Sequence, residues 1–138
     1  MKACLRDASL QPQQIEHINC HATSTAVGDP VEVLAIYNVF REHTAKLTLT
    51  AVKGATGHTL GATGAIESVF LLCTCHYGLV PPIRNLEQLD PKIEKLPVKP
   101  QFITGRAVEW NTPKRVALKN AFGFGGTNAC IAFSNFLE

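Results

Sequence analysis

The sequence predicts an α/β fold in which helices are layered on a mixed β-sheet. As far as Gly78, short apolar strand-like segments alternate with longer helix-like ones, which is the pattern of a sheet covered by helices. Near the end of the chain, two apolar segments are joined by a glycine-rich turn at residues 122–128, which indicates an antiparallel pair of strands. With 138 residues, the chain has the length of one domain.

Three helices are expected in the first part of the chain. The first spans residues 1–10 and carries leucine and alanine on one side. The second spans residues 29–43, because an acid followed by proline suits a helix N-terminus. The third spans residues 64–77 and ends at Gly78. Because its apolar residues lie on nearly every side, this third helix is expected to be central rather than superficial.

Four strands are expected, two before and two after a proline-rich region. Residues 15–20 form the first strand, and residues 47–52, where leucine alternates with threonine, form a second that is buried on one side. Residues 80–113 hold most of the prolines and are expected to be extended or looped, draped over the core. The final antiparallel pair is placed at residues 115–121 and 129–136.

Composition describes a globular chain and excludes several classes. Hydrophobic residues make up 46% and charged residues 17%, which is unlike a disordered or fibrous protein. A net charge of +2 is too small by itself to indicate a nucleic-acid partner. The longest apolar run, residues 65–81, contains Glu67 and is short for a membrane span. Five cysteines at irregular spacing, without a secretory signal before them, indicate reduced thiols inside a cell.

Two histidines stand at the ends of strand-like segments, each followed by small residues that leave the ring uncovered. His21 opens the run HATSTAVGDP, and His58 lies within KGATGHTLGATGA. A side chain that gains or loses a proton near neutral pH and is held at the end of a strand commonly serves in acid–base catalysis. No obvious nucleophile accompanies the two histidines, so together they look like half of an active site.

With a third motif, NAFGFGGTN at residues 120–128, these runs strongly resemble the C-terminal half of the β-ketoacyl-acyl carrier protein synthases. Order and spacing match throughout, and the resemblance covers essentially all of residues 1–138. It implies the second half of a thiolase-like fold, without its first strand and without the N-terminal half. Initiating enzymes carry asparagine in place of one histidine, so His58 implies an elongating, Cys-His-His synthase. Gly61 and Ala62 fit the fatty-acid enzymes better than the polyketide ketosynthases.

The resemblance implies that the chemistry is acyl transfer. In the family, a cysteine thiolate takes the acyl chain from acyl carrier protein, and malonyl-carrier protein loses carbon dioxide to give a carbanion that attacks the thioester. His21 and His58 would contact the malonyl thioester oxygen and promote decarboxylation. Lys53 would fix the electrostatics around His21. Glu67, on the following helix, would accompany Lys53, and a carboxylate inside an apolar helix needs such a partner.

Three further residues take roles from the same resemblance. The backbone N–H of Phe124 would form part of the oxyanion hole, and its ring would act as a gate between its glycine neighbours. Thr23 and Thr25 would hydrogen-bond the pantetheine arm. No metal and no organic cofactor is expected, since phosphopantetheine arrives with the acyl carrier protein.

The departures from the family concern the nucleophile. In the family it lies in an Asp-x-Ala-Cys-Ser motif of the N-terminal half, and none of the five cysteines here has that context. Cys20 is next to His21 but would point away from it along a strand. We therefore expect a fragment, truncated isoform or short gene product that is inactive alone in condensation. A second hypothesis is a non-catalytic partner that binds a complete ketosynthase, although such a partner has no need of the two histidines.

Other residues receive ordinary interpretations. His17, His43 and His76 are expected at the surface or beside helices, and Phe122 in the core. The Cys-Thr-Cys-His run at residues 73–76 invites a zinc site, but its side chains would point in different directions on one helix and no second ligand pair follows.

The expected partners are acyl carrier protein bearing acyl and malonyl groups and, in the full-length enzyme, a second copy of the protein. Arg106 and the lysines from Lys92 to Lys119 either dock an acidic carrier protein or form a solvated surface. Neither nucleic-acid binding nor a membrane span is expected. The run from Val108 to Arg115 favours the mitochondrial matrix as the compartment, with bacterial cytoplasm or plastid as alternatives.

Overall fold

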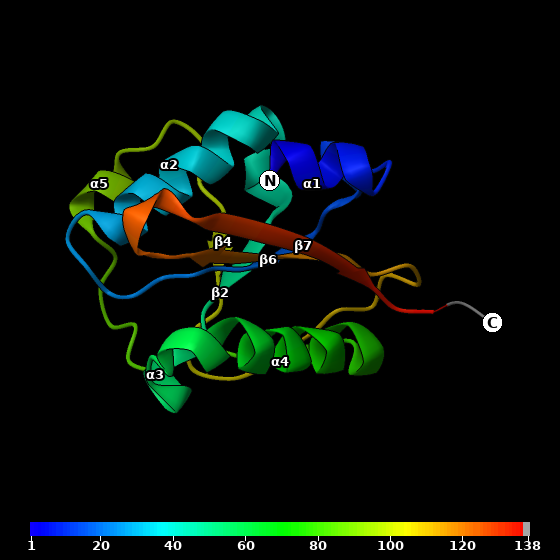
Figure 1. Cartoon of the computed structure of the whole chain (residues 1–138). Helices are drawn as coiled ribbons and strands as arrows, with labels where there is room; N and C mark the ends of the chain where they lie inside the picture. The colour runs from blue at the N-terminus through cyan, green and yellow to red at the C-terminus, as the bar shows by residue number, and fades with distance from the viewer. Residues whose placement is uncertain (137–138) are drawn as a thin grey trace.

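A mixed five-stranded sheet runs through the middle of the computed structural model, which describes residues 1–136 (Figure 1). Its strands are β1 (His17–Asn19), β2 (Thr48–Thr50), β4 (Gln101–Phe102), β6 (Val116–Phe122) and β7 (Asn128–Ser134). They lie in the order β4-β2-β1-β6-β7, in which only β7 runs antiparallel to its neighbour. The mixed sheet of an α/β fold and its terminal antiparallel pair are thus confirmed.

Helices cover both faces of this sheet (Figure 1). On one side lie α1 (Lys2–Asp7), α2 (Gly28–Phe40) and α5 (Pro91–Glu94), and on the other lie α3 (Lys53–Thr56) and α4 (Thr63–Tyr77). Short 3₁₀ turns span Pro12–Gln14, Arg41–Lys46, Leu60–Ala62 and Phe124–Gly126. The three expected helices are all present, and α2 ends earlier than predicted because Arg41 adopts a positive φ of 50°.

Two apolar clusters hold the layers together. The larger joins Ile18 and Leu49 of the central strands to Ile36 of α2. The smaller joins Leu71 of α4 to Trp110 and to the sheet. Each such fully buried side chain contributes about 1.5–3 kcal/mol relative to exposure. The larger cluster includes residues of β1, β2 and β6, and the smaller one includes a residue of β6. Packing therefore fixes the position of the carboxyl ends of these strands.

The expectation that residues 47–52 form a strand buried on one side only is wrong. Leu49 is fully buried, and Thr50 on the opposite face is only 1% exposed. The reason is that β2 lies between β4 and β1, inside a sheet that is covered on both faces. Threonine alternating with leucine therefore does not indicate a face exposed to solvent in this strand. The buried Thr50 hydroxyl has a polar neighbour within the protein, because His17 Nε2 lies 3.2 Å away.

Helix α4 is covered on one face only, so the expectation of a central helix is not met within this chain. Glu67 and Leu71 face the sheet and are buried. Val69, Phe70 and Leu72 are exposed, Val69 by 59% of its surface. An apolar surface on the outer side of α4 thus faces solvent in the described part of the chain. Within residues 1–136, no helix is both long and apolar enough to cross a membrane.

The proline-rich region at residues 80–113 is mostly extended, as expected, but it contains structure that local patterns did not indicate. β4 adds a parallel strand to the edge of the main sheet beside β2. β3 (Leu79–Val80) pairs with β5 (Val108–Glu109) in a separate antiparallel pair. Helix α5 did carry a signal, because Asp90 accepts a hydrogen bond from the Lys92 N–H as its N-cap and Pro91 follows directly.

Candidate active site

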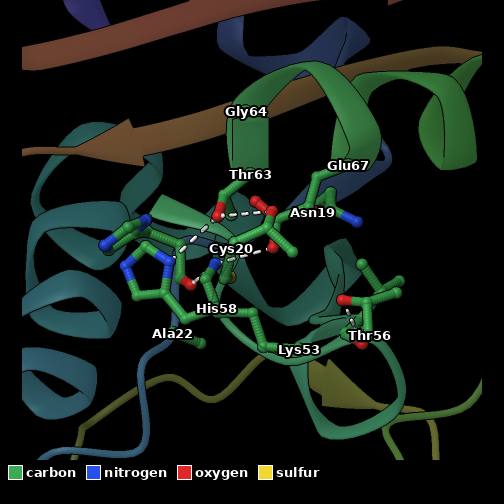
Figure 2. Close-up of polar contacts among 12 residues, drawn as sticks. Asn19, Cys20, Ala22, Lys53, Thr56, His58, Thr63, Gly64 and Glu67 are labelled. Atoms are coloured by element: carbon green, nitrogen blue, oxygen red, sulfur yellow. Dashed lines mark hydrogen bonds and ion pairs between the residues drawn. The ribbon is translucent and has the colours of Figure 1, made fainter. Parts of the chain in front are cut away.

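Four of the residues singled out in the sequence meet at the carboxyl ends of β1 and β2. His21 follows β1, and Lys53 begins α3 just after β2. His58 lies in the loop before α4, and Glu67 lies in the first turns of α4. Figure 2 shows Lys53, His58 and Glu67 gathered around the start of this helix. Because neighbouring parallel strands end at the same edge of a sheet, the fold brings these distant residues together.

The two imidazole rings lie edge to face, with ring centroids 5.6 Å apart. His58 Nδ1 is 2.9 Å from the Thr63 hydroxyl (Figure 2). The backbone N–H of Leu60 donates to the same nitrogen at 3.2 Å. Since a backbone N–H can only donate, Nδ1 is assigned as the acceptor, and in the neutral ring Nε2 carries the proton. The Nε2–H of His58 is thus available as a donor.

Lys53 and Glu67 form a buried ion pair beside the backbone of His21. Lys53 Nζ lies 2.6 Å from Glu67 Oε1, and it also donates to the carbonyl oxygen of His21. The side chains of Lys53 and Glu67 are 8% and 1% exposed. The buried carboxylate therefore has the partner that its apolar helix required, and Lys53 connects it to the backbone of His21.

A second ammonium, that of Lys119 on β6, also contacts Glu67. Lys119 Nζ lies 2.8 Å from Glu67 Oε2, and its side chain is 2% exposed. The interpretation of Lys119 as part of a solvated or carrier-docking surface is therefore wrong. The sequence did carry a signal for this burial. Lys119 lies in the middle of an apolar segment that was expected to be a strand.

The backbone at His21 is held by a carboxylate that the sequence did not single out. Glu32 on α2 accepts hydrogen bonds from the N–H groups of His21 and Ala22, each at 2.9 Å, and from Asn120 Nδ2 at 3.0 Å. Glu32 is 3% exposed, and this burial raises its pKa. The sequence carried a signal for Glu32, because this acidic residue lies on the same buried face of the helix as Val33 and Ile36.

The electrostatics of the site keep His21 uncharged. Burial, together with the positive charges of Lys53 and Lys119, lowers the pKa of His21 to about 4, against the opposing effect of Glu67. At neutral pH the imidazole of His21 is therefore neutral. The imidazole N–H groups of His21 and His58 can donate hydrogen bonds to one substrate oxygen and stabilise negative charge that develops on it.

The two phenylalanines of the third motif take different positions. Phe122, expected in the core, is only partly buried, and its ring lies edge-on to that of His21 with centroids 5.5 Å apart. Phe124 is fully exposed in the turn that follows β6. Two of its neighbours, Gly125 and Gly126, adopt φ values of 79° and 86°, which residues other than glycine rarely do.

Thr23 and Thr25 lie in the loop between His21 and α2. The Thr25 hydroxyl accepts a hydrogen bond from the Gly28 N–H at 3.0 Å, so it helps to shape the entry into α2. Thr25 also lines a cavity of about 580 Å³ between this loop, β2 and α5, to which neither His21 nor His58 contributes. Thr23 is partly buried.

His17 lies away from this site, and its expected place at the surface is wrong. It is 1% exposed at the start of β1, where Nε2 is 3.2 Å from the Thr50 hydroxyl and its ring lies near Trp110. Burial lowers the pKa of His17 to about 3. His43 flanks a helix as expected, with Nε2 2.8 Å from the Ile15 carbonyl oxygen, and His76 is exposed.

The thiols differ in accessibility, which predicts the order in which they react. Burial raises the pKa of Cys20 well above its usual value and raises the pKa values of Cys75 and Cys130 to about 11, whereas Cys73 is exposed. Because the thiolate is the reactive form, iodoacetamide at neutral pH should modify Cys73 of the folded chain at least about tenfold faster than Cys20. Peptide mass spectrometry at a series of times measures both rates.

Modification of Cys20 as fast as Cys73 in the native chain would contradict this prediction, and denatured chain, in which all thiols are exposed, provides the control.

Among residues 1–136, no group of three or more His, Cys, Asp or Glu side chains is placed to hold a metal ion.

Residues 1–87, which include both histidine motifs, match the family described as β-ketoacyl synthase, C-terminal domain. The chain belongs to this family. Its relatives include the mitochondrial 3-oxoacyl-[acyl-carrier-protein] synthase of Arabidopsis thaliana, 43% identical over 98% of this chain. The 3-oxoacyl-[acyl-carrier-protein] synthase 2 of Coxiella burnetii is 37% identical over 100% of the chain. The resemblance drawn from the three motifs is thereby confirmed.

Solved ketosynthases share the fold of this β-ketoacyl synthase domain. A type II polyketide ketosynthase in complex with its acyl-carrier protein superposes with a TM-score of 0.88 at 29% identity, covering 99% of this chain and 32% of that one. The ishigamide ketosynthase/chain length factor gives a TM-score of 0.86 at 28% identity over 98% of this chain and 31% of that one. The thiolase-like fold is thus confirmed. The chain spans 28% of the length of the Arabidopsis relative and 32% of the Coxiella relative.

Proposed function

We propose that this domain supplies the histidine-bearing part of a 3-oxoacyl-[acyl-carrier-protein] synthase that elongates acyl chains. The observation that carries the proposal is the pair His21 and His58, with ring centroids 5.6 Å apart, together with the ion pair of Lys53 and Glu67 beside the His21 backbone. Two ring N–H donors beside the ammonium of Lys53 suit a reaction in which an oxygen becomes negatively charged.

The reaction is a decarboxylative Claisen condensation. The bond between Cα and the carboxylate of the malonyl thioester breaks, carbon dioxide leaves, and the electron pair moves onto the thioester as an enolate. His21 and His58 hold the enolate oxygen through hydrogen bonds. The enolate carbon then attacks the carbonyl carbon of an enzyme-bound acyl thioester, a carbon–carbon bond forms, and the cysteine leaves as thiolate.

Further roles follow in the same proposal. The Phe124 N–H contributes to the oxyanion hole for the acyl thioester, and its exposed ring between glycines serves as a gate. Thr23 and Thr25 hold the pantetheine arm, which comes with the acyl carrier protein, so the chemistry uses no metal and no further organic cofactor. A solved ketosynthase neighbour is in complex with its acyl-carrier protein, which supports such a carrier as the partner.

The nucleophilic cysteine is supplied from outside residues 1–138, and the chain alone is inactive in condensation. The buried Cys20, with its raised pKa, is unsuited to act as a thiolate nucleophile. The complete enzyme works as a homodimer. We place it in the mitochondrial matrix, because relatives from Arabidopsis thaliana and Schizosaccharomyces pombe are named mitochondrial.

A chimeric enzyme tests the proposed function. Residues 1–138 replace the matching C-terminal segment of the Arabidopsis mitochondrial synthase, and formation of 3-oxoacyl product from acyl- and malonyl-carrier protein is measured. The chimera should condense, and His21→Ala should lower the rate about 10²–10³-fold through loss of one hydrogen-bond donor to the developing charge. The exposed His76, changed to alanine, is the matched control. A folded chimera without activity would overturn the proposal.

A second candidate function, a non-catalytic partner of a complete ketosynthase, is favoured by the exposed apolar residues on α4, such as Val69 and Phe70. Mixing the chain with a complete synthase and measuring the mass by size-exclusion chromatography with light scattering tests it. A stable complex whose activity is unchanged by His21→Ala would favour the partner role over the catalytic one.

A further inference from the structure

The ammonium of Lys119 is enclosed by oxygen atoms at the base of the site. Besides the contact to Glu67 Oε2 at 2.8 Å, it donates to the carbonyl oxygens of Cys20 at 3.1 Å and of Asn120, with that of Asn19 at 3.5 Å. These oxygens belong to the end of β1, to β6 and to α4. One ammonium thus ties together the three elements that surround His21.

The charges around the His21 ring are unbalanced. The positive charges of Lys53 and Lys119 lower the pKa of His21, and the negative charge of Glu67 opposes them. The carboxylate of Glu32 is occupied instead with backbone N–H groups and the amide of Asn120. A proton on the partly buried His21 ring would add a third positive charge to those of Lys53 and Lys119.

Lys53 alone does not account for this arrangement. It neutralises Glu67 through Oε1, and a single ion pair would leave the surroundings of His21 without a net charge. Lys119 Nζ lies 2.8 Å from the second oxygen of Glu67 and adds a second positive charge to the site. Burial of Lys119 is costly and lowers its pKa, an effect that Glu67 opposes.

We propose that Lys119 is a positioning residue of this site, whose ammonium fixes Glu67 against the end of β1 and, together with Lys53, keeps the His21 ring neutral as a hydrogen-bond donor. The consequence for catalysis rests on the proposed function, whereas the effect on the protonation of His21 does not.

Substitution Lys119→Met keeps the length of the side chain and removes its charge. In the folded chain, the pKa of His21 should rise from about 4 by about one unit, as expected for loss of a nearby like charge. Titration of imidazole carbon resonances by NMR in histidine-labelled protein measures the change. Lys46→Met, which removes an exposed lysine, is the matched control and should leave His21 unchanged. An unaltered His21 pKa in folded Lys119→Met would overturn the proposal.

Two additional measurements keep the proposal testable if Lys119→Met fails to fold. Lys119→Arg retains the charge, so its His21 pKa should stay near that of the parent chain, and a rise of about one unit there would contradict the charge effect. In the unmodified chain, the ammonium protons of Lys119 should exchange with water more slowly than those of Lys46. Equally rapid exchange at both lysines would show that the ammonium is not enclosed, and would overturn the proposal.

The catalytic consequence is measured in the chimeric enzyme. Lys119→Met should shift the acidic limb of the pH–rate profile upward by about one unit, because His21 then protonates at higher pH. A purely structural role would lower the rate without moving this limb. An inactive parent chimera would contradict the proposed condensation, while the His21 titration in the isolated chain would still decide the role of Lys119.

Discussion

Glu67→Gln is expected to lower the free energy of unfolding by about 3–5 kcal/mol, the effect typical of removing one partner from a buried ion pair. Glu67 is 1% exposed and contacts two ammonium groups, those of Lys53 and Lys119. Glutamine preserves the shape of the side chain but leaves both ammonium groups without a counter-charge. Urea denaturation followed by circular dichroism, at neutral pH and constant salt, measures the change.

Glu87→Gln provides the control for this substitution, because Glu87 is exposed and an isolated surface carboxylate contributes little to stability. Its free energy of unfolding should stay within about 0.5 kcal/mol of the parent value. A loss below about 1 kcal/mol for Glu67→Gln would mean that water reaches the two lysines. That result would contradict the buried cluster described here.

Acidification should destabilise the fold through His17. Burial lowers its pKa in the folded chain to about 3, whereas in the unfolded chain the pKa is about 6.5. The unfolded state therefore binds more protons between these values, so the stability contributed by neutral His17 is fully present above about pH 6.5 and is lost as the pH falls toward 3. At about 1.4 kcal/mol per pH unit, the total loss is about 4–5 kcal/mol.

Comparison with His17→Gln isolates this contribution. The variant keeps a polar group near the Thr50 hydroxyl, and its free energy of unfolding should depend much less on pH between about 6.5 and 3. Denaturant titrations at several pH values measure the slopes. His21 adds a smaller acid-dependent loss in both proteins, because it is only partly buried. His76→Gln, at an exposed position, should retain the parent slope. Equal slopes for His17→Gln and the parent chain would contradict the burial of a neutral imidazole.

The sequence predicted the elements whose signals are local and long enough to be recognised. Helix α4 ends at Gly78 in a left-handed conformation, and the β6–β7 pair has a glycine-rich turn, so both could be placed from their own residues. Strands β3, β4 and β5 have two residues each. They exist because of partners far away along the chain, and no pattern within two residues can indicate such a pairing.

The site also contains residues that local motifs could identify and residues that they could not. The motifs that contain His21 and His58 identified these two residues together with Lys53. Lys119 was assigned to the surface and Glu32 was not singled out, because their roles depend on burial beside groups on other elements, which only the folded chain establishes. His17 was misplaced for the same reason.

The exposed apolar side of α4 has a thermodynamic consequence. A molecule that covers Val69, Phe70 and Leu72 in the folded chain, and does not bind the unfolded chain, stabilises the fold by RT ln(1 + [L]/Kd). The midpoint of thermal unfolding then depends on the concentration of that molecule, and also on the concentration of the chain if copies associate through this face. The free energy of unfolding of this domain therefore depends on the concentration of any molecule that binds this face, as well as on the contacts within the chain.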